Sequence, residues 1–308
     1  MILLCGIPSE PPIALVTRAL EERGAAYRIF NQRRFAECSM VYEIRRGAFG
    51  GWLELYGEGI PLSAITGVYV RFMEMARLPE LSPLPAAAPE RAACRALHDT
   101  LTQWCDIAPA RVVNRTAAMA SNNSKPYQAQ LIQAAGFNVP ETLITNDPDL
   151  VRAFRARHGR IIYKSISGVR SIVQTLQDSD LERLDRIRWC PVQFQAYVEG
   201  TDVRVHVVGR EVFATEIASA ATDYRYAAQQ TGTSAELKET QLPEEVEARC
   251  VRLAQALGLP FAGIDLRLAP DRRVFCFEVN PCPGFSYYEA NTHQPIARAV
   301  AGYLAAED

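Results

Sequence analysis

The feature that most constrains this fold is a pair of apolar runs near the C-terminal end, joined by a short polar turn. They read GIDLRLA (263–269) and VFCFEVN (274–280), and the second run ends at NPCPG, where prolines and a glycine break it. Short apolar runs bounded by turn residues predict a buried β-hairpin. Successive side chains of a strand point to opposite faces. For the second strand, this alternation predicts a core face of Phe275, Phe277 and Val279 and an opposite face of Cys276, Glu278 and Asn280.

The opposite face of this hairpin carries too many oxygen-bearing side chains for a simple core strand. A turn at 269–272 places Asp265 across from Glu278 or Asn280. Two carboxylates across a strand pair repel each other unless a cation lies between them. Mg²⁺ takes hard oxygen ligands, usually one or two carboxylates plus phosphate oxygens. An exposed acidic face is the alternative, but the rigid NPCPG backbone favours a magnesium site of Asp265, Glu278 and Asn280.

The composition narrows the class of protein. With 308 residues, of which 48% are hydrophobic, the chain can bury a full core and form two or three subdomains. A net charge of -2 argues against nucleic acid or a membrane surface as partner. No apolar run approaches the ~20 residues that span a bilayer, and the opening MILLCGIP is typical of a first strand. Eight cysteines without a CxxC pair favour reduced thiols and a cytoplasmic location.

Lysine is rare in this chain, which makes its positions informative. The 33 basic residues include only Lys125, Lys164 and Lys238 as lysines. A compact ammonium suits a phosphate, whereas a position that needs only positive charge is equally served by arginine. Lys238 lies in a polar stretch and is interpreted as a surface residue. Lys125 begins a helix and Lys164 ends a strand, so we predict that both bind phosphates, although a surface position is the alternative for each alone.

The order of elements predicts an α/β protein. A strand at 2–7, a helix at 11–24 and a strand at 26–31 form a β-α-β unit, typical of an open α/β layer. The pattern of the sequence changes near Asn114, where we expect a domain boundary. The elements expected elsewhere are a hairpin and buried strand at 51–72, helices at 90–104, 126–136, 146–159 and 243–258, and strands at 141–145, 160–166, 192–198, 202–209 and 211–218.

Taken in order, these segments resemble the ATP-grasp superfamily, in its RimK-like branch of carboxylate–amine ligases. SNNSKPYQAQLIQAAGFNVPETLI and IIYKS are similar to the two lysine segments of that family, QAYVEGTD to its adenine hinge, and GIDL and FEVNPCPG to its magnesium segments. The resemblance begins near Asn114 and runs to the C-terminus. It implies an α/β (α+β) ATP-grasp fold in which two subdomains, at 114–190 and 191–308, sandwich the nucleotide. Residues 1–113 are then the N-terminal open α/β pre-grasp domain.

The resemblance also implies roles for individual residues, with ATP and Mg²⁺ as cofactors. Gln195 faces the adenine amino group, and Asp202 faces the ribose. Arg204 and Lys164 face the reacting phosphates, and Arg225 holds the acyl phosphate or the incoming carboxylate. The implied nucleotide-binding set is Lys125, Lys164, Gln195, Ala196, Tyr197, Val198 and Asp202, and the implied metal ligands are Asp265, Glu278 and Asn280.

The implied reaction is activation of a carboxylate as an acyl phosphate, followed by its joining to an amine or hydroxyl. SNNSKPYQ, FQAY, VFATEI and DYR resemble the ligases that close rings in ribosomal peptides of the microviridin (graspetide) type, whereas NPCPGFSYYE is closer to ribosomal-protein glutamate ligases. A peptide or protein substrate is therefore expected, and nucleic-acid and membrane partners are not. A ligase of small metabolites and a non-catalytic nucleotide-binding regulator are the alternatives. A homodimer is one oligomeric state that the sequence leaves open.

Overall fold

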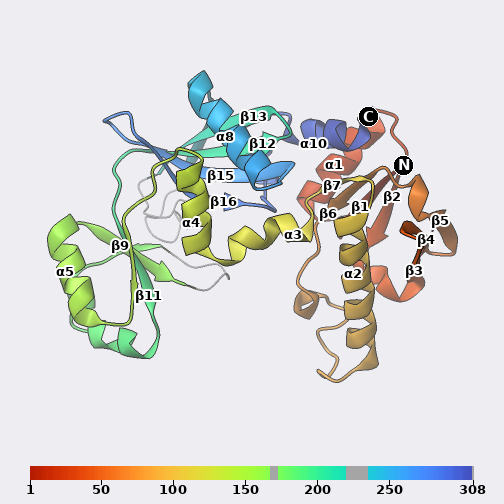
Figure 1. The fold of residues 1–308 in the computed structure, drawn as a ribbon, viewed down its shortest axis with the longest axis horizontal. Helices are drawn as coiled ribbons and strands as arrows, with labels where there is room; N and C mark the ends of the chain where they lie inside the picture. Colours follow the sequence, from red (N-terminus) through yellow and green to blue (C-terminus); the bar gives the residue numbers. More distant parts are fainter. Residues whose placement is uncertain (167–172, 220–234, 307–308) are drawn as a thin grey trace.

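A parallel sheet of four strands forms the N-terminal part of the chain. The computed structural model describes residues 1–166, 173–219 and 235–306 (Figure 1). The sheet has the order β2-β1-β6-β7. Its strands are β1 (Ile2–Gly6), β2 (Tyr27–Asn31), β6 (Gly67–Val70) and β7 (Arg111–Val113). Helix α1 (Pro11–Glu22) links β1 to β2, which pair in parallel, so the predicted β-α-β unit is confirmed.

Helices cover both faces of this sheet. The apolar stripe of α1 packs in one core cluster with the C-terminal helix α10 (Ile296–Ala305), and the two helices are in contact. Helix α2 (Pro89–Ile107) contributes Leu101 and Trp104 to the cluster on the other side. No helix was predicted after Asn280, so α10 and the preceding α9 (Ser286–Thr292) were missed. The chain thus returns to its N-terminal sheet at its end, as the neighbouring α1 and α10 in Figure 1 show.

A small antiparallel sheet of order β3-β4-β5 extends the N-terminal part. Its strands are β3 (Cys38–Arg45), β4 (Ala48–Leu55) and β5 (Glu58–Pro61). The predicted hairpin followed by a buried strand is confirmed in β4, β5 and β6, whereas β3 was not predicted. None of the described helices is both long and apolar enough to cross a membrane.

A second lobe contains an antiparallel sheet of order β10-β9-β11-β8. Its strands are β8 (Thr142–Thr145), β9 (Ile161–Ser165), β10 (Gln174–Thr175) and β11 (Val192–Ala196). Helices α3 (Thr116–Met119) and α4 (Lys125–Ala134) precede the sheet, and α5 (Pro148–His158) and α6 (Asp178–Leu181) lie within it in chain order. In Figure 1 this sheet and α5 lie on the side of the molecule opposite the N-terminal sheet.

Between these two parts lies an antiparallel sheet of order β14-β13-β12-β15-β16 (Figure 1). Its strands are β12 (Thr201–Val208), β13 (Glu211–Ala218), β14 (Glu236–Thr240), β15 (Phe261–Leu268) and β16 (Val274–Asn280). Helix α8 (Glu244–Ala256) packs its buried Val246 and Leu253 into the core of one face, where α4 adds Ile132. The predicted C-terminal hairpin is confirmed as β15 and β16.

The alternation predicted for β16 is wrong at its middle. The register shifts between Asp265 and Leu266, which pair with Glu278 and Cys276 and leave Phe277 as an extra residue. Such a β-bulge breaks the period of two. As a result Cys276 is fully buried in the core, and Phe277 is only partly buried. The prediction that Cys276 shares a face with Glu278 and Asn280 is therefore corrected.

Candidate functional site

The oxygen-bearing residues of β15 and β16 lie on adjacent strands at the end of the hairpin. The register pairs Asp265 with Glu278 and Gly263 with Asn280. It therefore decides between the two partners that the sequence left open for Asp265. Residues that face each other in an antiparallel pair share one side of the sheet, with Cβ atoms about 5 Å apart. The two carboxylates are thus neighbours, as the sequence predicted.

Each of these carboxylates has a cation beside it. The Lys125 ammonium on α4 lies 2.7 Å from Glu278 Oε1 and also donates to Asn122 Oδ1 at 2.7 Å. Arg204 on β12 donates from Nη1 to Asp265 Oδ1 at 2.7 Å. Both pairs are largely buried, with 20% and 29% of the Lys125 and Glu278 side chains exposed. Each of the two carboxylate charges is therefore compensated by a cation within the site.

Electrostatics link Glu278 to cations from three different elements. Burial alone would raise the pKa of the Glu278 carboxyl, but the charge and hydrogen bond of Lys125 and the charges of Lys164 and Arg204 lower it below its ordinary value. Lys164 reaches this environment from β9, in the other lobe. The structure thus gathers Lys125, Lys164 and Arg204 around one ionised carboxylate. Their functional roles stay predictions.

The predicted adenine hinge follows the end of β11. The Gln195 side chain is buried and donates to Thr142 Oγ1 at 2.9 Å. The backbone amides of Ala196 and Tyr197 donate to carbonyls of the segments that flank this sheet. Val198 is tied down differently, because its carbonyl accepts a hydrogen bond from the Arg267 guanidinium at 2.8 Å. The hinge backbone is therefore held on both sides.

Arg267 is a residue that sequence reasoning missed. Its Nε and Nη2 donate to the two oxygens of Asp202 at 2.7 and 2.8 Å, in a bidentate pair. This pair fixes the orientation of Asp202, the predicted ribose ligand, while the bond to Val198 fixes the hinge beside it. The sequence signal was weak because Arg267 on its own looks like an exposed charge on a strand. Only its pairing with Asp202 across β12 and β15 reveals the role.

Two further buried polar residues hold the end of β16, which carries the predicted ligands Glu278 and Asn280. Gln128 on α4 is 1% exposed, and its side-chain amide exchanges hydrogen bonds with the backbone of Val279, at 2.8 Å to the carbonyl and 3.0 Å from the amide. Asn114 does the same for Phe261 and also donates to the carbonyl of Pro281. Gln128 lies in the quoted lysine segment, yet nothing in its pattern separates it from an exposed glutamine.

Asn280 caps the turn that follows β16. Its Oδ1 accepts a hydrogen bond from the Cys282 amide at 2.9 Å. Arg225, the remaining predicted residue, lies outside the described residues. In the described part of the chain there is no group of three or more His, Cys, Asp or Glu side chains placed to hold a metal ion.

The side-chain oxygens of Asp265, Glu278 and Asn280 fit a Mg²⁺ ion that is also bound by phosphates. Two adjacent carboxylates and one amide oxygen are hard ligands, but they are too few to enclose the ion. Mg²⁺ is usually bound through one or two carboxylates plus substrate phosphates, rather than in an all-protein cage. The cations that accompany the carboxylates would then face the phosphate oxygens.

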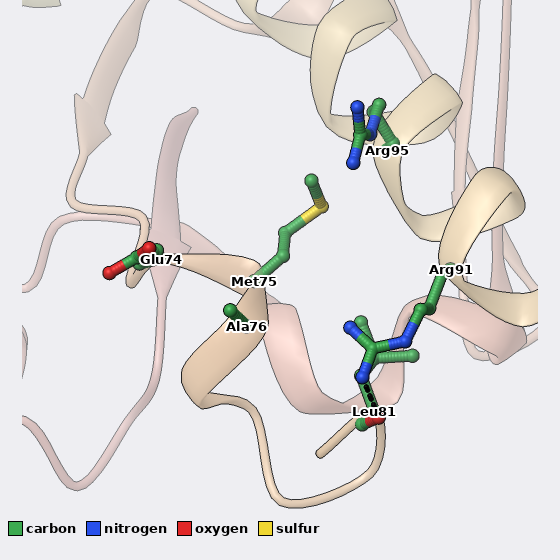
Figure 2. A pocket seen from close by; sticks show the side chains of 6 residues that line it. All are labelled: Glu74, Met75, Ala76, Leu81, Arg91 and Arg95. Atoms are coloured by element: carbon green, nitrogen blue, oxygen red, sulfur yellow. Dashed lines mark hydrogen bonds between the residues drawn. The ribbon is translucent and has the colours of Figure 1, made fainter. Parts of the chain in front are cut away.

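A separate cavity lies in the N-terminal part, where the loop after β6 faces α2. It has a volume of about 190 Å³ and is lined by Glu74, Met75, Ala76, Leu81, Arg91 and Arg95 (Figure 2). The Arg91 guanidinium is committed to structure, because it donates to the carbonyls of Leu81 and Leu84. None of the predicted site residues lines this cavity.

Curated relatives match about two thirds of the chain. The probable alpha-L-glutamate ligase of Photobacterium profundum is 29% identical over 203 residues, which are 62% of this chain and 66% of that protein. A probable alpha-L-glutamate ligase of Pseudomonas aeruginosa is 28% identical over 204 residues, with the same shares. The chain thus spans slightly less than two thirds of the length of these curated relatives.

Solved structures match over almost the whole chain. The ATP-grasp ligase PsnB complexed with minimal precursor superposes with a TM-score of 0.78 and 28% identity, over 98% of this chain and 97% of that one. The macrocyclase MdnC of Microcystis aeruginosa, bound with precursor peptide MdnA, gives a TM-score of 0.80 at 24% identity over 100% of both chains. At that identity the second match shows the fold alone.

A family model also matches the part of the chain that carries the site. The model described as the RimK-like ATP-grasp domain matches residues 122–304. This range contains Lys125 and Lys164, the predicted hinge, and the strands β15 and β16 that carry the predicted metal ligands. The predicted ATP-grasp fold is therefore confirmed, and the chain belongs to the RimK-like ATP-grasp family.

Proposed function

We propose that this chain is an ATP-dependent ligase that activates a carboxylate and joins it to an amine or hydroxyl of a peptide or protein. The observation that carries the proposal is the pair of contacts Lys125–Glu278 and Arg204–Asp265, each 2.7 Å long, beside the predicted nucleotide hinge. Cations and metal-binding oxygens side by side suit a polyphosphate that brings its own Mg²⁺.

In the proposed reaction, an oxygen of the substrate carboxylate attacks the γ-phosphorus of ATP, and the bond to the β-phosphate oxygen breaks. The products are an acyl phosphate and ADP. An amine or hydroxyl then forms a bond to the acyl carbon, phosphate leaves, and the nucleophile loses a proton. Mg²⁺ supplies positive charge at the phosphates when it is bound by Asp265, Glu278 and Asn280.

The side chains of the protein position the reactants and offset their charge. Lys125 and Lys164 bind phosphate oxygens, and Arg204 stabilises negative charge that develops during transfer. Gln195 and the hinge backbone from Ala196 to Val198 hold the adenine, and Asp202, fixed by Arg267, holds the ribose. Arg225 is assigned to the acyl phosphate or the incoming carboxylate.

A peptide substrate is supported by the PsnB structures, which are 27–28% identical to this chain and whose complexes include a precursor, Mg and ADP. The curated relatives named probable alpha-L-glutamate ligase favour a second candidate, the addition of a free amino acid such as glutamate.

All eight cysteines are free, which supports a cytoplasmic location.

Two measurements test the function. The first is ADP formation by the purified protein with Mg²⁺ and ATP, which we expect to depend on an added acceptor. The second is the mass of a candidate precursor peptide encoded beside the gene. Loss of one water per bond supports ring closure, whereas gain of a glutamate residue supports the second candidate. A protein that neither binds ATP nor forms ADP would contradict both.

A further inference from the structure

Gly263 lies on β15 between its neighbouring strands, close to the side chains of Arg204 and Pro283. It pairs with His206 of β12 on one side and with Asn280 of β16 on the other. A Cβ atom built on Gly263 would lie 2.2 Å from Nη2 and 2.7 Å from Cζ of Arg204, and 2.7 Å from Cβ of Pro283. Real Cβ atoms essentially never come within 3.0 Å of such neighbours. A larger residue therefore cannot occupy this position unless Arg204 or Pro283 moves.

The backbone does not require glycine at this position. The φ angle of Gly263 lies outside the left-handed region, so an alanine could adopt the same strand conformation. Glycine within a strand often marks a place where another group approaches the backbone closely. Here the approaching group is the guanidinium of Arg204.

The other neighbours of Arg204 also restrict the orientation of its side chain. Asp265 accepts from Nη1 at 2.7 Å, and the ring of Tyr288 from α9 lies 5.8 Å from the guanidinium carbon. Only 6% of the Arg204 side chain is exposed. A side chain enclosed in this way has little freedom to adopt a new rotamer if the Gly263 side of the space is filled.

Pro283, on the second side of Gly263, belongs to the turn that follows Asn280. Its carbonyl accepts a hydrogen bond from Arg71 at 3.0 Å, and Arg71 is paired with Glu10 at 2.8 Å. The turn is thus anchored to the N-terminal part of the chain and cannot easily retreat from an added side chain. Arg204 is therefore the group that a substitution at Gly263 would displace first.

We propose that Gly263 is a positioning residue, whose missing side chain lets the Arg204 guanidinium lie against β15 in the orientation that serves the nucleotide phosphates. This inference rests on the proposed function, because that function assigns Arg204 to the phosphates. Gly263 itself touches no reactant and acts only through Arg204.

The test is a double-mutant cycle of G263A and R204A, read out by calorimetric titration with Mg²⁺ and AMP-PNP. A charge-assisted hydrogen bond contributes about 1.5–3 kcal/mol, so R204A should weaken binding about 10- to 100-fold. G263A should weaken it to a similar degree. In the double variant the two effects should not multiply, because no guanidinium remains to be displaced.

The melting temperature gives a second readout that does not need a ligand. G263A should melt below the wild type, and R204A should do so too, because Asp265 loses its partner. The drop that G263A causes should be smaller in the R204A background than in the wild type, because only the overlap with Pro283 remains there. G59A is the matched control. The φ of Gly59 also lies outside the left-handed region, and its added Cβ would meet only the Trp52 ring at 4.0 Å. This control should bind and melt like the wild type.

The outcomes separate the two proposals. If G263A binds the nucleotide and melts like the wild type, or if it lowers the melting temperature as much in the R204A background as in the wild type, the positioning role of Gly263 is wrong. If G263A does not fold but the double variant does, the role is supported. If the wild type does not bind Mg²⁺ with AMP-PNP at all, the proposed function fails, while the melting comparison still tests the contact.

Discussion

The Lys125 ammonium and the Glu278 carboxylate form a direct pair at 2.7 Å, although 153 residues separate them in the sequence. One residue begins α4, and the other lies near the end of β16. In the proposed function Lys125 binds phosphate and Glu278 binds the metal. The same contact therefore makes Lys125 a competitor of any divalent cation for this carboxylate.

K125M should separate metal binding from nucleotide binding. Without the ammonium, Glu278 is free to face a cation, so Mn²⁺ alone should bind about 10-fold more tightly than to the wild type. AMP-PNP with Mg²⁺ should bind more weakly, because a phosphate contact is lost. Titration of each ligand measures the two effects. K238M, at an exposed position of β14, is the control, and equal Mn²⁺ affinities for K125M and the wild type would contradict the competition.

Q128L should disturb β16, which carries the proposed ligands Glu278 and Asn280. The Gln128 amide satisfies both backbone groups of Val279, between the two proposed ligands Glu278 and Asn280. Leucine leaves these buried groups without partners, at about 1–3 kcal/mol each. We expect a lower free energy of unfolding in urea and weaker Mg²⁺-dependent nucleotide binding. Q133L, an exposed position of the same helix, should change neither. A Q128L protein with wild-type stability would refute this role.

R267M should loosen the nucleotide hinge. The Arg267–Asp202 pair is mostly buried, with 12% and 25% of the side chains exposed, and loss of one partner leaves a charge without compensation. We expect a loss of about 2 kcal/mol in unfolding free energy and several-fold weaker AMP-PNP binding. R273M breaks the exposed pair with Asp271 in the same hairpin and should change the unfolding free energy far less, because solvent screens an exposed pair. Equal losses in the two variants would show that burial of the pair is unimportant.

The stability of the protein should fall in mild acid because of His98. Burial lowers the pKa of His98 to about 4 from an ordinary value near 6.5, against a smaller opposing effect of Asp99. Between these values the unfolded chain binds a proton that the folded chain does not, so stability is fully present above pH 6.5 and declines as the pH falls toward 4. This group alone accounts for about 2 kcal/mol between pH 7.5 and 5.

Urea unfolding of H98Q at several pH values tests this origin. The variant loses the stacked contact of His98 with Phe72, so its stability at pH 7.5 should be lower. Its decline between pH 6.5 and 4 should nevertheless be shallower than that of the wild type. The exposed His293 offers the control H293N, which should keep the wild-type slope. Parallel pH profiles for H98Q and the wild type would rule out His98 as the source.

The local elements of the site could be predicted because each has its own sequence signal. Turn residues define the hairpin of β15 and β16, and the Ser124 side chain caps α4 just before Lys125, as the start of a helix requires. Rarity singled out Lys125 and Lys164. What these signals share is that they involve residues close together in the chain.

The parts that were missed depend on pairings between distant segments. The bulge at Phe277 arises from the fit of β16 to β15, and regular alternation cannot reveal it. Arg267 gains its role only because β12 lies beside β15. Gln128 looks like any polar residue of a helix until α4 is packed against β16. Helix α10 belongs to the N-terminal core although it ends the chain.

The most direct test of the account is calorimetric titration of AMP-PNP into the wild type and E278Q, each with and without Mg²⁺. The account predicts that Mg²⁺ strengthens nucleotide binding to the wild type by at least about 10-fold and that E278Q loses most of this gain. Nucleotide binding that is independent of Mg²⁺, or an E278Q protein that keeps the full gain, would contradict the proposed metal–nucleotide site.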